Sequence, residues 1–364
     1  DLGKSRYPGE SRGLVFCNQL IFLDAGFRRH DVCGGFSTFY EVANKGDNRM
    51  RIAVLDDYFN VSQKLTDWKQ LGGRADITVF QEPFDGEETA AGNLADFEII
   101  VGMRERTRFP ASLLRRLPKL RLLITTGKRN PSFDVSAARA QGITVCGTGG
   151  VGVPTAELAV GLMIALMRDI PGQFASLRQG GWQTRLGCGL AGKTLGLLGL
   201  GKVGSAVAAA GNAFRMRVIA WSQNLTEAQA NEHHVQRVEK EELFRQSDLL
   251  SLHVVLSDRT IGMVGARELG LMKPTAYLIN TSRWRVVDEG ALFQALREKR
   301  IAGAAIDVYP IEPLPPDDPI RRLDNVLLTP HLGYVTEENF ARMYQDAVED
   351  IVAFLDGKPI RVIE

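Results

Sequence analysis

The chain has 364 residues, 45% of them hydrophobic and 24% charged, which is long enough for about two domains and too apolar for a disordered protein. Its 44 basic and 43 acidic residues nearly cancel, so no net charge favours nucleic acid or an anionic membrane as a partner. The longest apolar run, residues 158–167, falls well short of the roughly twenty residues that a membrane span needs. We therefore expect neither nucleic acid binding nor a transmembrane segment.

The four cysteines are too few and too scattered for a disulfide scaffold, and none forms a Cys-x-x-Cys pair; they are Cys17, Cys33, Cys146 and Cys188. The five histidines do not have the spacing of zinc ligands. We expect free thiols, a cytoplasmic location and no metal site.

Residues 1–49 mix Gly, Ser, Asn and Arg with short apolar runs and show neither a sustained period nor a secretory signal pattern. Met50 stands directly before residues 51–55, which have the composition of a buried strand. We expect residues 1–49 to be a non-globular extension and the functional protein to begin near Met50.

From Met50 onward, short apolar runs alternate with helical patterns. Strands are expected first at 51–55, 76–80, 97–101 and 120–125, and then at 195–200, 217–221, 249–254, 276–280, 303–308 and 325–329. Helices are expected at 158–168, 202–214, 239–246, 288–299 and 336–357. The strands are uniformly apolar, which is typical of parallel sheets covered on both faces, and the alternation predicts a doubly wound α/β fold.

A glycine-rich turn lies between a predicted strand and a predicted helix. Gly199, Gly201 and Gly204 fit the pattern G-x-G-x-x-G, with Lys202 and Val203 between the last two glycines. In this setting the glycines make the turn, let backbone approach a pyrophosphate and let helix and strand pack closely. The N–H groups that begin the helix favour phosphate binding. The sequence therefore predicts a dinucleotide site.

The expected partner of the ribose is missing from this fingerprint. The second strand ends at Ser222-Gln223-Asn224, where an NAD site would carry an acidic residue, and no basic residue stands there to attract a 2′-phosphate. Ser222 can hydrogen-bond either sugar, or it can be a simple turn residue. The cofactor is thus predicted to be NAD or NADP.

Polar side chains follow three later strands at the sheet edge where open α/β sheets bind ligands; they are Arg283, Asp307 with Glu312, and His331. A guanidinium can grip a carboxylate in two hydrogen bonds. An imidazole exchanges protons near neutral pH, and a carboxylate beside it stabilises the protonated form. Such a set can reduce a 2-keto acid, which needs a hydride on carbon and a proton on oxygen.

These motifs together resemble the D-isomer-specific 2-hydroxyacid dehydrogenases, on their phosphoglycerate-dehydrogenase-like side. The resemblance runs from about Met50 to the C-terminus and includes Asn280-Thr281-Ser282-Arg283, Ala305-Ile306-Asp307-Val308 and Thr329-Pro330-His331. It implies that His331 is the proton donor to the keto oxygen, Glu312 its partner and Arg283 the substrate clamp. It also implies cofactor contacts at Asp307, Thr281 and His253.

The same resemblance implies two Rossmann-like or flavodoxin-like domains. Residues 50–147 and 333–364 would form a substrate-binding domain, into which an NAD(P)-binding domain, residues 148–332, is inserted. Loops that follow two strands of the first domain are expected to hold the substrate carboxylate through Arg104, Gly127 and Lys128. The resemblance also implies a homodimer.

We therefore predict an oxidoreductase that transfers a hydride between a nicotinamide cofactor and a small D-2-hydroxy or 2-keto acid. Glyoxylate, hydroxypyruvate and phosphoglycerate stay open as substrates. A nucleotide-sensing corepressor on the same fold is the alternative, whereas Glu312 argues against the formate dehydrogenases, which have Gln there. Trp284 replaces the glycine that usually follows the arginine, and we expect its bulk to narrow the site.

Overall fold

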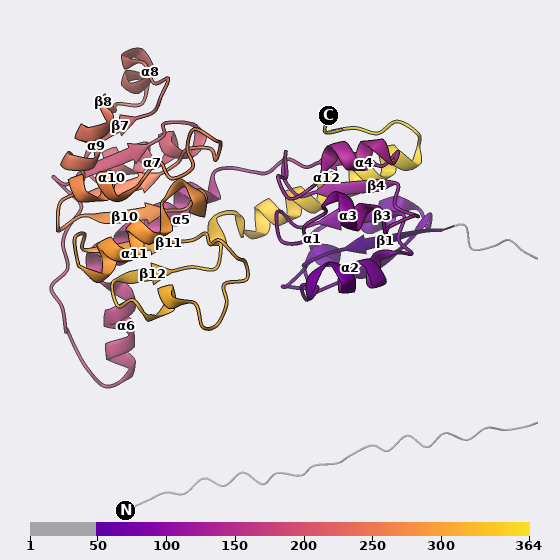
Figure 1. Cartoon of the computed structure of the whole chain (residues 1–364), viewed down its shortest axis with the longest axis horizontal. Coiled ribbons are helices and arrows are strands. Elements are labelled where there is room, and N and C mark those ends of the chain that lie inside the picture. Colours follow the sequence, from indigo (N-terminus) through magenta and orange to yellow (C-terminus); the bar gives the residue numbers. More distant parts are fainter. Residues whose placement is uncertain (1–48) are drawn as a thin grey trace, which may run out of the picture. The chain divides into compact units, whose positions relative to one another are not determined.

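The structure is a computed structural model that describes residues 49–364. The expectation for residues 1–49 lies outside this range, apart from Arg49. The described chain forms two parallel sheets, each with its own helices (Figure 1).

The first sheet has the strand order β2-β1-β3-β4-β5, and every pairing is parallel. Its strands are β1 (Met50–Val54), β2 (Ala75–Val79), β3 (Ile99–Gly102), β4 (Leu122–Thr125) and β5 (Thr144–Gly147). The helical segments around it are α1 (Ser62–Leu65), η1 (Trp68–Leu71), α2 (Gly86–Leu94), α3 (Ala111–Leu114) and α4 (Val135–Ala140). Alternate residues of β1, β3, β4 and β5 enter two different apolar clusters, as Ile52 and Ala53 do. Both faces of these strands are therefore buried, which explains their apolar runs, whereas the edge strand β2 exposes every second residue.

The second sheet has seven parallel strands in the order β12-β11-β10-β9-β6-β7-β8. They are β6 (Thr194–Leu198), β7 (Arg217–Trp221), β8 (Gln236–Arg237), β9 (Leu249–Leu252), β10 (Tyr277–Asn280), β11 (Gly303–Ile306) and β12 (Val326–Leu328). The strand order reverses between β6 and β9, and ligands of doubly wound sheets bind at such a switch point. The predicted fold class is confirmed.

Helices of the second sheet include α5 (Pro154–Arg168), α7 (Lys202–Ala213), α8 (Glu227–Glu232), α9 (Lys240–Gln246), α10 (Ala266–Leu271) and α11 (Glu289–Arg297). Short 3₁₀ segments are η2 (Trp284–Val286), η3 (Pro319–Arg322) and η4 (Leu332–Tyr334). The predicted helix 158–168 is confirmed, and its start at Pro154 reflects the fixed φ of proline at the first helical position.

The C-terminal helix α12 (Glu337–Leu355) returns to the first sheet, where it packs on α1, η1 and β4 (yellow in Figure 1). It begins at Thr336, whose hydroxyl accepts a hydrogen bond from the N–H of Asn339. Phe340, Ala347 and Ile351 are buried on one face, so the predicted long terminal helix is confirmed.

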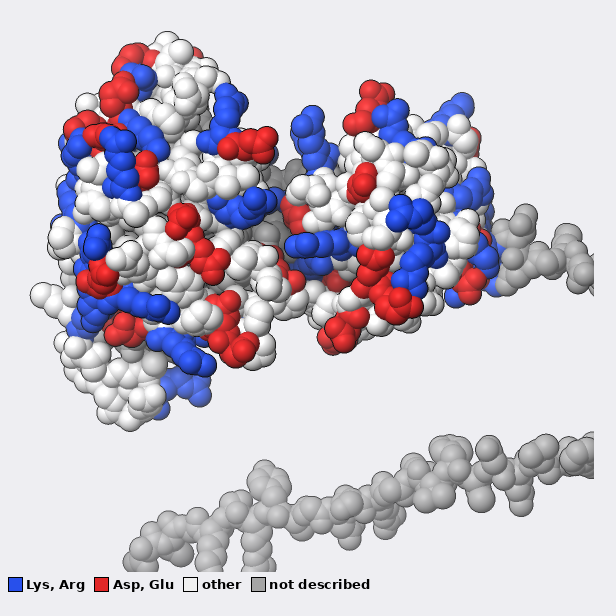
Figure 2. All heavy atoms as spheres, in the orientation of Figure 1, with Lys and Arg blue, Asp and Glu red and all other residues white. Residues whose placement is uncertain are grey.

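Two strands lack a sequence prediction, β5 and β8. β5 has only four residues, and β8 has two. Within residues 49–364, no single helix is long and apolar enough to cross a bilayer, and α5 meets those criteria only jointly with α6 (Ile170–Arg178), at a bend of 62°. Basic and acidic side chains interleave on the face shown in Figure 2, in line with the balanced composition.

Candidate active site

The glycine turn after β6 leaves open space beside the first turn of α7. A Cβ on Gly199, whose φ is +104°, would lie 2.8 Å from the carbonyl carbon of His253, and one on Gly204 would overlap the carbonyl oxygen of Gly199. A Cβ on Gly201 would meet nothing within 4 Å. Packing of the chain therefore requires Gly199 and Gly204, whereas a side chain at Gly201 would fill space that a phosphate group can occupy.

Unpartnered polar groups line a cavity of about 1370 Å³ near this turn, together with Val203 of α7. Both ring nitrogens of His253 and the hydroxyl of Thr281 are buried and have no hydrogen-bond partner in the described part of the chain. Burial lowers the pKa of His253 to about 4, so the ring is neutral at pH 7. Buried polar groups without partners are rare in proteins, and these fit the edges of a bound nucleotide.

The other predicted cofactor residues lie at the turn and at the end of the next strand. Lys202 is the exposed first residue of α7. Ser222 follows β7, where its carbonyl accepts a hydrogen bond from the N–H of Leu225. The residues of the turn and cavity therefore fit a dinucleotide, and the predicted contact of Ser222 with the ribose stays a prediction.

His331 and Glu312 form a close pair between β11 and α12. Nδ1 of His331 lies 2.6 Å from Oε2 of Glu312, and Oε1 of Glu312 accepts a hydrogen bond from the N–H of Tyr309 at 2.9 Å. The ring of Tyr334 meets the imidazole edge-on, with 5.2 Å between ring centroids. Glu312 therefore fixes the orientation of the imidazole and leaves Nε2 for other contacts. Both residues line a second cavity, of about 580 Å³.

Asp307 holds the segment that carries His331. Its carboxylate is fully buried and accepts hydrogen bonds from Oγ1 of Thr329 at 2.6 Å and from the N–H groups of Leu332 and Gly333 at 2.7 and 2.9 Å. Burial raises the pKa of Asp307, although these donors oppose the shift. The side chain therefore contacts the residues around His331, and its predicted contact with the nicotinamide stays a prediction.

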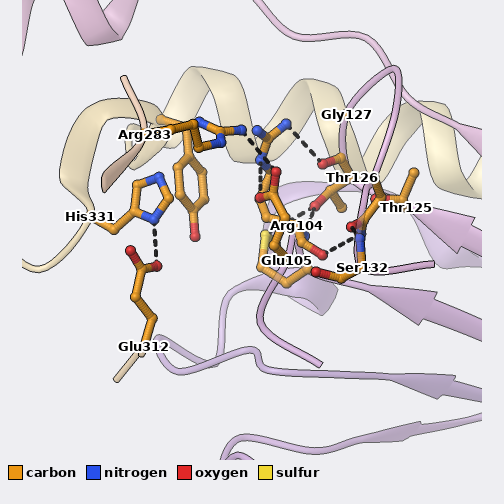
Figure 3. A network of polar contacts seen from close by, with 12 residues as sticks. Arg104, Glu105, Thr125, Thr126, Gly127, Ser132, Arg283, Glu312 and His331 are labelled. Atoms are coloured by element: carbon orange, nitrogen blue, oxygen red, sulfur yellow. Dashed lines mark hydrogen bonds and ion pairs between the residues drawn. The ribbon is translucent and has the colours of Figure 1, made fainter. Parts of the chain in front are cut away.

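Arg283 follows β10 and contacts a residue that the sequence analysis missed. Its guanidinium donates to the carbonyl of Ser282 and, from Nη2, to Oε1 of Glu105 at 2.8 Å. Oε2 of Glu105 lies 3.5 Å from Nε of Arg104 (Figure 3). Glu105 stands between two arginines in the loop after β3, and this alternation of charges in a loop at the sheet edge is the one sequence signal that pointed to it.

The three predicted catalytic side chains converge. In Figure 3 the imidazole of His331 lies between the side chains of Glu312 and Arg283. Burial raises the pKa of Glu105, but the charges of Arg104, Arg283 and His331 outweigh burial and lower it. Because the charges of Arg283 and His331 both act on Glu105, the two residues belong to one electrostatic site.

The loop predicted to hold the substrate carboxylate differs from expectation at one position. Gly127 has φ +125°, and its N–H already donates to Oγ1 of Thr148 at 2.9 Å, so this group is not free to bind a carboxylate as we expected. Lys128 is exposed and lines the larger cavity. The side chain of Arg104 is 20% exposed, and its guanidinium lies 5.5 Å from the ring centroid of Tyr334. Lys128 and Arg104 stay predicted substrate contacts.

Trp284 points away from the site. The residue is 6% exposed within the apolar core of the second sheet, and Nε1 donates to Oε2 of Glu289 at 3.2 Å. Neither cavity beside Arg283 and His331 is lined by Trp284. The expectation that its bulk narrows the site is therefore wrong, because the 3₁₀ turn η2 directs the ring inward.

A doubly wound sheet with an open glycine turn, a histidine–carboxylate pair and an arginine defines a nicotinamide-dependent oxidoreductase. Comparisons with known proteins agree. Residues 160–333 match the profile of the D-isomer specific 2-hydroxyacid dehydrogenase, NAD binding domain. The glyoxylate reductase of Korarchaeum cryptofilum is 38% identical over 255 residues, which cover 68% of this chain and 77% of that protein.

Two further relatives extend the likeness. The D-3-phosphoglycerate dehydrogenase of Archaeoglobus fulgidus is 35% identical over 73% of this chain, and the match spans 51% of its own length. The crystal structure of a phosphoglycerate oxidoreductase from Vibrio cholerae superposes with a TM-score of 0.81 at 39% identity, covering 85% of this chain and 99% of that one. The chain belongs to the D-isomer specific 2-hydroxyacid dehydrogenase family. It is an oxidoreductase that uses NAD or NADP to interconvert small 2-hydroxy and 2-keto acids by hydride transfer.

Proposed function

We propose that His331 donates the proton to the keto oxygen of the substrate from Nε2 and takes it back in the reverse direction. The 2.6 Å contact between Nδ1 and Glu312 is the observation that carries this proposal. It fixes which nitrogen is left for the substrate, and the carboxylate stabilises the imidazolium form of the ring.

The guanidinium of Arg283 binds the substrate carboxylate through hydrogen bonds and also stabilises the negative charge that develops on the keto oxygen. Bound nicotinamide supplies or accepts the hydride. The turn at Gly199, Gly201 and Gly204 with Lys202 and Val203 holds the dinucleotide phosphates, whereas Thr281, His253, Ser222 and Asp307 are assigned to its sugars and rings. Residues 148–332 thus serve as the cofactor domain, and residues 50–147 with 333–364 serve as the substrate domain.

The substrate is a small D-2-hydroxy acid or its keto acid. Relatives named glyoxylate reductase, hydroxypyruvate reductase and D-3-phosphoglycerate dehydrogenase favour short, carboxylate-bearing compounds. A panel of 2-keto acids assayed with NADH and with NADPH, followed by chiral analysis of the product, tests the proposal. No turnover of any keto acid with either cofactor, or an L product, would contradict it.

The second partner we propose is another copy of this chain. α6 and the loop after it expose five large apolar side chains, which are 49 to 95% accessible: Ile170, Phe174, Leu177, Trp182 and Leu186. Such a concentration is typical of a surface that a partner covers. Light scattering on the purified protein is expected to give twice the chain mass, and Phe174→Glu with Leu177→Glu is expected to halve it. A monomeric wild type would contradict the homodimer.

We also propose a cytoplasmic location. Of the cysteines in the described range, Cys146 is buried and Cys188 exposed, and both are free thiols. Cell fractionation followed by thiol titration tests this location. We expect the protein in the cytosolic fraction, with Cys188 reduced.

A further inference from the structure

Glu105 places a carboxylate inside a site that must also bind the carboxylate of the substrate. Its side chain is 21% exposed and lines the larger cavity, and its Oε1 accepts a hydrogen bond from Arg283 at 2.8 Å. The residue therefore shares the guanidinium with any acid bound there.

The charges around this carboxylate set how much negative charge the site can neutralise. Arg104 and Arg283 are both within ion-pair distance of Glu105, which they and His331 keep ionised at neutral pH despite its burial. Arg104, Arg283 and the protonated His331 carry three positive charges against the two carboxylates of Glu105 and Glu312, which leaves a single positive charge. One substrate carboxylate balances it, and a second anionic group does not.

We propose that Glu105 is a specificity-determining residue that restricts the enzyme to 2-keto acids with one negative charge and disfavours those with a phosphate or second carboxylate on C3. This inference rests on the proposed function, because it presumes that Arg283 grips the substrate carboxylate. A second anion on C3 is only a few bonds from the carboxylate that Arg283 binds, and it is therefore held close to Glu105, where repulsion is poorly screened.

The other basic residues of the same cavity do not reverse this selection. Arg342 and Arg361 line it, but both form ion pairs with the carboxylate of Asp346. Lys128 and Arg129 also line it, and both are exposed. Solvent and salt screen exposed charges far more than buried ones. The carboxylate of Glu105, which is only 21% exposed, therefore acts more strongly on a bound anion than Lys128 and Arg129 do.

The test uses two pairs of keto acids that differ in one anionic group: pyruvate with oxaloacetate, and hydroxypyruvate with 3-phosphohydroxypyruvate. kcat/KM is measured for each with the wild type, Glu105→Gln and Glu105→Ser. Gln keeps an oxygen that accepts from Arg283 but carries no charge. Glu88→Gln is the matched control, since Glu88 pairs with Arg116 on the surface and lines neither cavity. Cofactor fluorescence titration verifies that each variant retains its cofactor site.

The wild type is expected to prefer the singly charged member of each pair, and both Glu105 variants are expected to shift that ratio toward the multiply charged member by about tenfold or more. An equal loss on all four acids would mean that Glu105 only orients Arg283, and the selectivity proposal would be overturned while the proposed function stands. A wild type that prefers the multiply charged acids would overturn it as well. If no keto acid is reduced by the wild type, the proposed function fails and this inference fails with it.

Discussion

Nδ1 of His331 lies 2.6 Å from Oε2 of Glu312. The two residues that follow His331, Leu332 and Gly333, donate hydrogen bonds from their N–H groups to the carboxylate of Asp307. The carboxylate of Glu312 fixes Nδ1 of the imidazole, and Nε2 is left for the substrate. His331→Gln is expected to lower kcat by about 10²- to 10⁴-fold, because a positioned general acid contributes that much. Cofactor affinity, measured by NADH or NADPH fluorescence, is expected to stay near the wild-type value. A variant that loses cofactor binding instead would assign His331 a structural role.

Arg283 is expected to tolerate no replacement by lysine. The guanidinium already donates to Ser282 and Glu105, and it needs further donors for the substrate. A lysine ammonium lacks the planar fork that meets all of these acceptors together. Arg283→Lys should therefore lower kcat/KM for the keto acid at least about tenfold, with cofactor KM little changed. Near-normal kinetics would remove Arg283 from the substrate clamp.

Substitution of Asp307 tests whether this residue positions the segment around His331 or contacts the cofactor. Asp307→Asn replaces one acceptor oxygen by an NH₂ group that faces the N–H donor of either Leu332 or Gly333. We expect a loss of about 1–3 kcal/mol in the free energy of unfolding and a lower kcat, because the segment around His331 loosens. Urea titration and steady-state kinetics measure both. If the KM for the cofactor rises while stability holds, Asp307 contacts the nicotinamide as the sequence predicted.

Substitutions of two glycines in the turn, Gly201 and Gly204, are expected to have different effects: the first weakens cofactor binding, and the second lowers stability. Ala at position 201 meets no atom of the chain within 4 Å, so Gly201→Ala should unfold at the wild-type temperature but bind the cofactor at least about tenfold more weakly. Ala at position 204 overlaps the carbonyl oxygen of Gly199, so Gly204→Ala should lose about 1–3 kcal/mol of stability. Thermal melts and fluorescence titrations of the two variants make the comparison. Wild-type cofactor affinity in Gly201→Ala would show that the open space is not a phosphate site.

The sequence predicted the parts of the fold that depend on local patterns. Uniform apolar runs marked most strands, since alternate residues of each are buried on opposite faces. Residues that end neighbouring parallel strands, such as Arg283 and Asp307, could be placed at one edge because strand ends meet there. β5 was missed because Thr144 and Gly147 leave it only two apolar residues, and β8 was missed because Gln236 and Arg237 are both polar.

Contacts between distant segments could not be predicted in the same way. Glu105 and Arg283 are 178 positions apart, and no periodicity links a loop after β3 to a loop after β10. The inward direction of Trp284 depends on the turn η2, and the pairing of the Gly127 N–H depends on where Thr148 lies. Such contacts follow from tertiary packing, which composition and spacing do not contain.

A buried acid near the C-terminal end of α12 is expected to give the fold a pH dependence of its own. Asp350 is fully buried, and burial raises its pKa to about 7, although Arg361, whose Nε donates to Oδ1 at 2.8 Å, opposes the shift. Because this pKa lies above the ordinary value near 3.8, the folded state binds the proton more tightly than the unfolded state. The stabilising contribution is thus complete below about pH 4 and is lost as the pH rises toward about 7.

Asp350→Asn keeps an oxygen for Arg361 and has no charge to bury. Relative to the wild type, its free energy of unfolding should therefore increase by roughly 1–2 kcal/mol between pH 5 and pH 8, less than the full shift implies because Arg361 already compensates part of the charge. Urea unfolding of both proteins at the two pH values measures this difference. A gap between variant and wild type that is the same at pH 5 and pH 8 would show that Asp350 does not titrate in this range.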